Sequence, residues 1–172
     1  MDLCTSMVLE RKEIESVLEK YEISTTEEAV AFADALTKII WNHNQLGLIY
    51  DYYDENAVYK GAYGKKITGP DSVVLEFLAM QAAFPNLRVH ITESFGRALE
   101  DGGYAVYQRS YAEGTNSGTS QYGPPTGNKL NESNSLGQTV YQIHKVNNRW
   151  KVTEEVSLRS EEVIEKLLKN EA

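Results

Sequence analysis

Apolar residues recur at helical spacing in the first part of the chain. Two successive helices are predicted within residues 26–53, separated by Trp41-Asn42. The apolar face of the first helix is formed by Ala29, Ala33, Leu36 and Ile40. The second, shorter helix shows the same pattern at Leu46, Ile49, Tyr50 and Tyr53. Alternation of apolar and polar residues begins at 57–59, which predicts a strand directly after the second helix.

Three further helices are predicted: one before the main domain, one in its middle and one at its end. An amphipathic pattern over residues 7–22 predicts a helix ahead of the main domain. We therefore divide the chain into an N-terminal helical extension, 1–23, and a single domain, 24–172. The extension is interpreted as a packing or dimer-contact helix, with a lid over a pocket as the alternative. Gly69-Pro70-Asp71 has the signals of a helix start, and Pro85-Asn86 ends that helix. A last helix is predicted over residues 160–168.

From Leu87 onward the apolar period is two, which is typical of half-buried strands. Strands are predicted at 87–92, 104–112, 136–146 and 149–158, the last two joined by a tight turn at Asn147-Asn148. Residues 113–135 contain almost no aliphatic side chain, and a loop of that length is usually functional or mobile. It is expected either to close over a pocket or to contact a neighbouring subunit.

This order of elements predicts an α+β fold. Helices precede and interrupt a long run of strands, which favours a cone-shaped, strongly curved and mainly antiparallel sheet with the N-terminal helices on its concave side. A pocket is expected between the sheet and the helices. Such pockets are mostly apolar and contain a few polar groups that orient a ligand.

Composition narrows the classes of partner. The chain has 172 residues, with 17 basic and 25 acidic side chains and a net charge of -8. This balance argues against nucleic acid as a partner, because phosphate binding requires clustered Lys and Arg. No segment has the apolar length of a membrane span, and the N-terminus lacks the pattern of a secretory signal. We expect a cytoplasmic protein.

Residues that bind metals or cofactors form no recognisable pattern. Cys4 is the only cysteine, and the three histidines have neither the spacing nor the acidic neighbours of a metal site. No phosphate-binding loop or dinucleotide fingerprint is present. We expect neither a metal nor a cofactor.

An ordered set of short motifs points to a family. The set consists of Trp41-Asn42, Tyr52-Tyr53, Gly69-Pro70-Asp71, Ala83-Phe84-Pro85-Asn86-Leu87-Arg88-Val89, Arg109, Gly114-Thr115, Gly118 and Gly123-Pro124-Pro125-Thr126-Gly127. With these motifs the chain resembles the SnoaL-like polyketide cyclases, or ester cyclases, of the nuclear transport factor 2-like superfamily. The resemblance covers roughly Thr26 to Ser157 and implies an α+β cone, a deep apolar pocket and a homodimer. The superfamily contains both enzymes and binding modules, so the resemblance does not settle activity.

Three positions depart from what the resemblance implies for catalysis. In the cyclases an aspartate on a central strand is the general acid/base, and Thr139 occupies its position here. The motif histidine of the family corresponds to Asn116, and the aspartate-histidine pair at the end of the first strand corresponds to Tyr59-Lys60. Threonine and asparagine form hydrogen bonds, but neither acts as a general base at neutral pH.

The remaining candidate chemistry depends on strand alternation. If Thr139 faces the pocket, Tyr141 faces it too. Arg109 and Glu154 each share a strand face with large apolar side chains, so we predict that both lie inside the cone. They are expected to form either a structural ion pair or the polar anchor of a site. In the second case Arg109 and Tyr141 polarise a carbonyl group while Glu154 acts as the base.

Two functions from different classes follow. The first is a cofactor-independent isomerase, cyclase or dehydratase for a hydrophobic carbonyl compound, with Arg109, Tyr141 and Glu154 as catalytic residues. The second is a ligand-binding or accessory protein that has lost the acid/base residues of the family. In either case the ligand is expected to be a hydrophobic or aromatic small molecule, because tyrosines are frequent on the pocket elements. The residues predicted to bind it are Trp41, Tyr53, Tyr59, Tyr111, Asn116 and Thr139.

Overall fold

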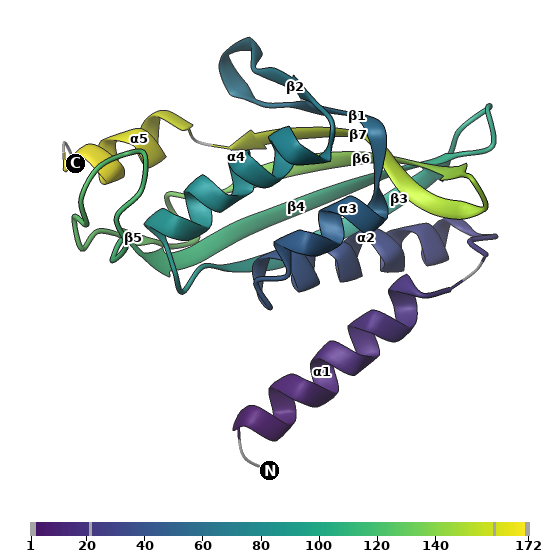
Figure 1. Cartoon of the computed structure of the whole chain (residues 1–172), viewed down its shortest axis with the longest axis horizontal. Helices are drawn as coiled ribbons and strands as arrows, with labels where there is room; N and C mark the ends of the chain where they lie inside the picture. Colours follow the sequence, from purple (N-terminus) through teal and green to yellow (C-terminus); the bar gives the residue numbers. More distant parts are fainter. Residues whose placement is uncertain (1–2, 21, 160, 171–172) are drawn as a thin grey trace.

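The computed structural model describes residues 3–20, 22–159 and 161–170 (Figure 1). Its helices and strands are α1 (Leu3–Leu18), α2 (Thr26–Trp41), α3 (Ile49–Tyr52), β1 (Tyr53–Lys60), β2 (Lys66–Thr68), α4 (Pro70–Ala83), β3 (Arg88–Ala98), β4 (Tyr104–Thr115), β5 (Lys129–Leu130), β6 (Gly137–Val146), β7 (Arg149–Arg159) and α5 (Glu161–Lys169). Short 3-10 turns lie at Leu46–Leu48 and Ala62–Gly64.

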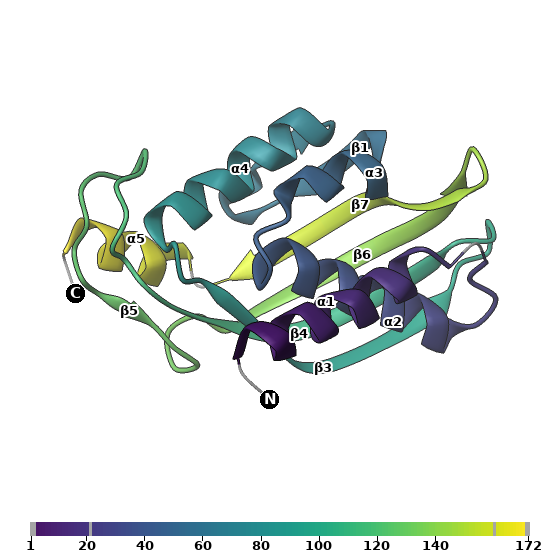
Figure 2. The ribbon, with the colours of Figure 1, turned by 60° about the horizontal axis from the view of Figure 1, so that its bottom comes forward.

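One curved sheet organises the molecule, and the predicted α+β cone is confirmed. The strand order is β2-β1-β7-β6-β4-β3, with β5 paired to β4. Only the β1–β7 pairing is parallel among the described strands; the other pairings are antiparallel. Helices α2, α3 and α4 lie over one face of this sheet, α2 across β3 and β4 and α4 towards β1 (Figures 1 and 2). The core, and the site described below, lie between these helices and the sheet.

Helix α2 begins and packs as its sequence predicts. The hydroxyl of Thr25 accepts the backbone N–H of Glu28, and the Glu28 carboxylate accepts the N–H of Ser24 in return, which resembles a capping box. The predicted apolar face is buried against the sheet: Ala29, Ala33, Leu36 and Ile40 are each at most 2 % exposed. Burial of this face fixes α2 as one wall of the interior.

Helix α1 packs mainly on α2 (Figures 1 and 2). It begins and ends earlier than the predicted 7–22, and it buries Ile14 and Leu18. Position 21 of that prediction, and position 160 of the predicted closing helix, lie outside the described residues. The contact with α2 supports the interpretation of α1 as a packing helix.

The helix predicted up to Tyr53 is shorter than expected. Asn44 adopts a positive φ of 54°, a 3-10 turn follows, and α3 ends at Tyr52. Tyr53 already belongs to β1, where it pairs in parallel with Val152 of β7. Pairing with a distant strand overrides the local helical spacing here. Such pairing cannot be predicted from the spacing of apolar residues along the sequence.

The long loop between β4 and β6 is held by Asn116. This side chain is 2 % exposed. Its amide donates to the carbonyl of Ala83 at the end of α4 (2.8 Å) and accepts from the backbone N–H of Thr126 (2.8 Å). Asn128 in turn donates to the carbonyl of Leu167 in α5 (2.8 Å). The loop therefore ties α4 to α5 at one end of the sheet. The side chain of Asn116, predicted to bind substrate, is buried and hydrogen-bonded within the loop.

Replacing Asn116 by alanine is expected to destabilise the fold by about 2 kcal/mol, because the N–H of Thr126 loses its partner and the carbonyl of Ala83 loses the shorter of its two hydrogen bonds. The measurement is urea unfolding followed by circular dichroism. Gln121→Ala, at an exposed position of the same loop, serves as the control and should change stability by less than about 0.5 kcal/mol. Equal effects of the two changes would contradict the structural role of Asn116.

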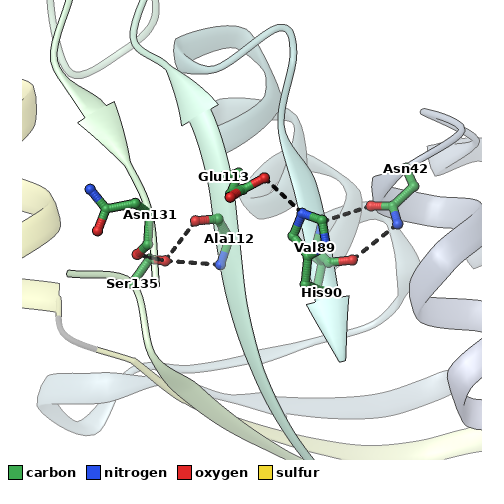
Figure 3. A network of polar contacts seen from close by, with 7 residues as sticks. All are labelled: Asn42, Val89, His90, Ala112, Glu113, Asn131 and Ser135. Atoms are coloured by element: carbon green, nitrogen blue, oxygen red, sulfur yellow. Dashed lines mark hydrogen bonds and ion pairs between the residues drawn. The ribbon is translucent and has the colours of Figure 1, made fainter. Parts of the chain in front are cut away.

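Side-chain amide and hydroxyl groups also fix the edge of the interior between α2 and the loop (Figure 3). Asn42 donates to the carbonyl of Val89 (3.0 Å) and accepts its N–H (2.7 Å), which extends the β3 ladder onto the end of α2. On the neighbouring strand β4, the N–H of Ala112 donates to the hydroxyl of Ser135 (2.9 Å). Val89, Ala112 and Ser135 all line the internal cavity, so these bonds set one of its walls.

Candidate functional site

The interior of the cone contains a small cavity. It has a volume of about 60 Å³ and lies between α2, α4 and the inner faces of β4, β6 and β7. This is room for a few water molecules. A larger chamber of about 490 Å³ adjoins it, between the β1–β2 connection, α4 and α5. Met80 and Ile164 line both spaces, so these side chains form part of the partition between the two.

A β-bulge in β7 decides which acidic residue faces the cavity. Gln142 pairs with Glu154 and the next residue, Ile143, pairs with Val152, so that Thr153 is one extra residue on β7. An extra residue reverses the alternation of side chains beyond it. Val152 is fully buried before the bulge, and Glu155, 4 % exposed, faces inward after it.

Glu155 is surrounded by three tyrosines. The hydroxyl of Tyr53 donates to the Glu155 carboxylate at 2.5 Å. Across the sheet, Tyr59 on β1 and Tyr141 on β6 are the direct partners of Glu155 on its two sides. All three tyrosines are at most 3 % exposed. A carboxyl group is thus held between phenol groups in a region that water hardly reaches.

Burial raises the pKa of Glu155 to about 7, against an ordinary value of 4.5, although the hydrogen bond from Tyr53 and the charge of Arg159 lower it in part. Burial also raises the pKa of Tyr53 and Tyr141 well above 10, and that of Tyr59 above 10. Near neutral pH the tyrosines therefore keep their protons, while Glu155 exchanges its own. A group with these properties is suited to general acid/base chemistry.

A chain of hydrogen bonds orients Tyr141. Its hydroxyl lies 3.1 Å from that of Thr37 on α2. Thr37 donates to the side-chain carbonyl of Gln108 (2.9 Å), whose amide donates to Asp34 (2.7 Å). Since the proton of Thr37 is used by Gln108, Tyr141 is the donor in its bond to Thr37. The proton of Tyr141 is consequently committed to Thr37.

Arg159 lies on the same strand face as Glu155. Its Nη2 donates to the hydroxyl of Tyr59 at 3.4 Å, and its Nε lies 3.4 Å from the carboxylate of Glu161 at the start of α5. Within the described part of the chain, the hydroxyl of Tyr59 accepts this bond and donates none of its own. Tyr59 is therefore the tyrosine whose proton is available at this site.

The predicted pairing of Arg109 and Glu154 is wrong. Arg109 is exposed on β4, where it contacts Thr92, because its neighbour Gln108 occupies the inner face. Glu154 forms an ion pair with Lys60 on β1. The bulge at Thr153 explains the second error, since regular alternation from Val152 placed Glu154 inside.

The other predicted site residues gather in or beside the cavity, with the exception of Asn116. Trp41, Tyr111, Thr139 and Tyr141 line it. Thr139 lies 3.3 Å from Ser157 on the adjacent strand, hydroxyl to hydroxyl. Tyr59 lines the larger chamber, and Tyr53 holds Glu155. Sequence reasoning missed Glu155 and Arg159; the only signal was the Glu154-Glu155 pair, one of which must face inward on any strand.

Replacing Tyr53 by phenylalanine is expected to raise the pKa of Glu155 above its value of about 7 in the native protein, because the hydrogen bond that is lost favours the carboxylate form. The measurement is a pH titration of the side-chain carboxyl carbon of Glu155 by NMR. Tyr107→Phe, on the outer face where Tyr107 stacks on Phe95, should leave the titration unchanged. A lower pKa of Glu155 in Tyr53→Phe would contradict the arrangement.

Within the described residues, no group of three or more His, Cys, Asp or Glu side chains is placed to hold a metal ion. In the same part of the chain, no helix combines the length and apolar character needed to cross a membrane.

The chain was compared with known proteins. The model of the SnoaL-like polyketide cyclase family matches residues 31–161. No curated protein matches the chain significantly. Among solved structures, Aln2 from a Streptomyces species is 15% identical, with a TM-score of 0.61 over 83% of this chain and 98% of that one.

Two further structures show how widely this fold is used. A protein assigned as a SnoaL-like polyketide cyclase from a Jannaschia species is 12% identical, with a TM-score of 0.64 over 86% of this chain and 96% of that one. Nuclear transport factor 2 from Cryptosporidium parvum is 11% identical, with a TM-score of 0.56 over 74% and 88%. At these identities the likeness concerns the fold, which supports more than one activity.

Proposed function

The chain belongs to the SnoaL-like polyketide cyclase family, and from this premise we propose that it is an enzyme that moves a proton at carbon next to a carbonyl group. The reaction is an isomerisation, cyclisation or dehydration of a hydrophobic small molecule. Glu155 is the general acid/base. The observation that carries the proposal is the burial of Glu155 among three tyrosines with a pKa of about 7.

Glu155 compensates for the missing aspartate of the family. Thr139 stands at the position where the resemblance places the acid/base on the central strand, and its strand β6 pairs directly with β7. Glu155 reaches the same cavity from β7. Moving the carboxyl group to the neighbouring strand preserves a base in the cavity even though the family's own position is occupied by threonine.

The three tyrosines around Glu155 have different roles in the proposed reaction. Tyr53 holds the carboxylate of Glu155 in position through its hydrogen bond. Tyr141 is fixed by Thr37 and forms part of the cavity wall. Tyr59, whose proton is available, donates to the carbonyl oxygen of the substrate as negative charge develops there. Tyr59 takes the role that was expected of Tyr141 and Arg109.

The substrate occupies both spaces. The inner cavity of about 60 Å³ admits only the reacting end of a molecule. The chamber of about 490 Å³ receives the rest, and its walls include the aromatic rings of Tyr63 and Tyr122. The other walls combine apolar side chains such as Met80 with charged ones such as Lys65 and Glu76, which suits an aromatic compound that carries polar groups.

The active form is proposed to be a homodimer that associates through the outer face of the sheet. On that face Phe95, 58 % exposed, stacks against Tyr107 with ring centroids 5.0 Å apart. Aromatic side chains are enriched at protein–protein interfaces, and this supports the outer face as the contact surface.

The test is deuterium exchange at carbon. The native chain is incubated in heavy water with a panel of enolisable ketones, such as 1-tetralone, acetophenone and cyclohexanone, and incorporation next to the carbonyl is followed by NMR. Catalysed exchange by the native chain that is lost in Glu155→Gln supports the proposal. Binding of these ketones, seen as shifts in NMR signals of the protein, without exchange favours the non-catalytic alternative.

A further inference from the structure

The inner face of β7 beyond the bulge carries a row of polar residues. Glu155, Ser157 and Arg159 all line the cavity. The guanidinium of Arg159 has five N–H donors in a planar fork. Within the described part of the chain its contacts to Tyr59 and Glu161 are both long, at 3.4 Å. Its Nε is buried and forms no hydrogen bond of acceptable geometry with any described residue.

The geometry points to Arg159 as the binding site for a carboxylate group of the substrate, an inference that rests on the proposed function and narrows it to carbonyl compounds that also carry an acid. The planar fork of arginine matches the two oxygens of a carboxylate. The side chain is one-fifth exposed, so a ligand can reach it.

The distance between Arg159 and Glu155 suits such a substrate. Their positions are four residues apart along the strand, which is about 13 Å between their Cα atoms, and the two side chains form no ion pair in the described structure. Arg159 is nevertheless near enough for its charge to lower the pKa of Glu155. A carboxylate bound to Arg159 would extend past Tyr59 towards Glu155 and place its carbonyl oxygen and the adjoining carbon between the two.

The carboxylate of Glu161 competes with a substrate carboxylate for the guanidinium of Arg159. It lies at the start of α5, and among the described residues its carboxylate is the one that forms an ion pair with Arg159. A substrate carboxylate would share or displace this contact. The arrangement therefore predicts opposite effects on ligand binding when either member of the pair is changed.

The experiment compares benzoate with its neutral counterpart benzamide by calorimetry and NMR. Benzoate is expected to bind the native chain more tightly than benzamide, and Arg159→Gln is expected to weaken benzoate binding by a factor of at least about ten. Arg159→Lys should fall between the two, since lysine keeps the charge but loses the fork. Glu161→Gln should tighten benzoate binding by a factor of about three. Arg97→Gln, an exposed arginine on β3 that contacts Tyr107 and lies away from Arg159, should change nothing.

A second readout excludes a purely structural role. Benzoate bound to Arg159 brings a negative charge near Glu155, so it should raise the pKa of that carboxyl group further in the native chain but not in Arg159→Gln. Equal binding of benzoate and benzamide, or tight benzoate binding by Arg159→Gln, would overturn the inference. If Arg159→Gln fails to fold, Glu161→Gln decides: tighter benzoate binding supports the inference, and unchanged or weaker binding refutes it.

The two proposals fail in different ways. Glu155-dependent exchange of neutral ketones without any preference for benzoate would leave the proposed enzyme standing and remove the carboxylate site. Arg159-dependent benzoate binding without exchange of any compound would keep the carboxylate site in a binding protein.

Discussion

Glu155→Gln is expected to lower the rate of proton exchange by a factor of about 10² to 10⁴, whereas Glu154→Gln leaves it within about twofold. Glutamine keeps the size of the side chain and still accepts the hydrogen bond from Tyr53, but it takes up no proton. Glu154 lies on the opposite face and pairs with Lys60. The two adjacent glutamates therefore allow the same substitution to be made on the inner and on the outer face of the sheet.

The pH dependence of the exchange rate in the native chain provides a second test of Glu155 as the base. Because the carboxylate form of Glu155 is the base, the exchange rate should rise with pH and level off above its pKa of about 7. Glu154→Gln should show the same profile. A native profile without an inflection near neutrality, or loss of activity in Glu154→Gln to the same extent as in Glu155→Gln, would show that Glu155 is not the base.

The stability of the native chain is expected to fall by about 3 kcal/mol between pH 4.5 and pH 8 relative to Glu155→Gln. The pKa of Glu155 is about 7 in the folded protein and near its ordinary value of 4.5 in the unfolded chain. Between these values the folded state retains a proton that the unfolded state has released. Raising the pH therefore favours unfolding, and the loss is complete once the folded protein also releases the proton.

Urea unfolding at pH 4.5, 6 and 8 measures this effect. Comparison with Glu155→Gln removes the contributions of all other titrating groups, and Glu154→Gln serves as the control that keeps Glu155. The native chain and Glu154→Gln should lose stability in parallel, while Glu155→Gln gains relative to both as the pH rises. A constant difference between the native chain and Glu155→Gln at all three values would mean that Glu155 titrates alike in both states, and that its burial does not shift its pKa.

The two experiments on Glu155 separate physical cause from function. The stability measurement reports whether burial holds the carboxyl group in its neutral form, and requires no substrate. The exchange measurement reports whether the protein uses that property. A raised pKa without exchange would describe a ligand pocket that retains a buried acid, so the two outcomes together distinguish an enzyme from a binding protein.

Local sequence signals determined much of the fold. The apolar face of α2, the start of α4 at Pro70 and the turn at Asn147-Asn148, where φ is 48° and 63°, all follow from interactions between residues close in sequence. Strand periodicity determined most of the sheet, and motif order determined the family. Periodicity, caps and turns are set by neighbouring residues, so these features can be predicted without knowing which distant strands pair.

Tertiary structure alone decided the identity of the acid. Regular alternation on β7 placed Glu154 in the interior, and one extra residue at Thr153 placed Glu155 there in its stead. A bulge is a property of two paired strands, because it exists only where two residues on one strand face one on the other. The raised pKa of Glu155 follows from the same pairing, since the three tyrosines around it come from β1 and β6. The sequence by itself determined the cone and its family, and the pairing of distant strands determined which of two adjacent glutamates can carry a proton inside it.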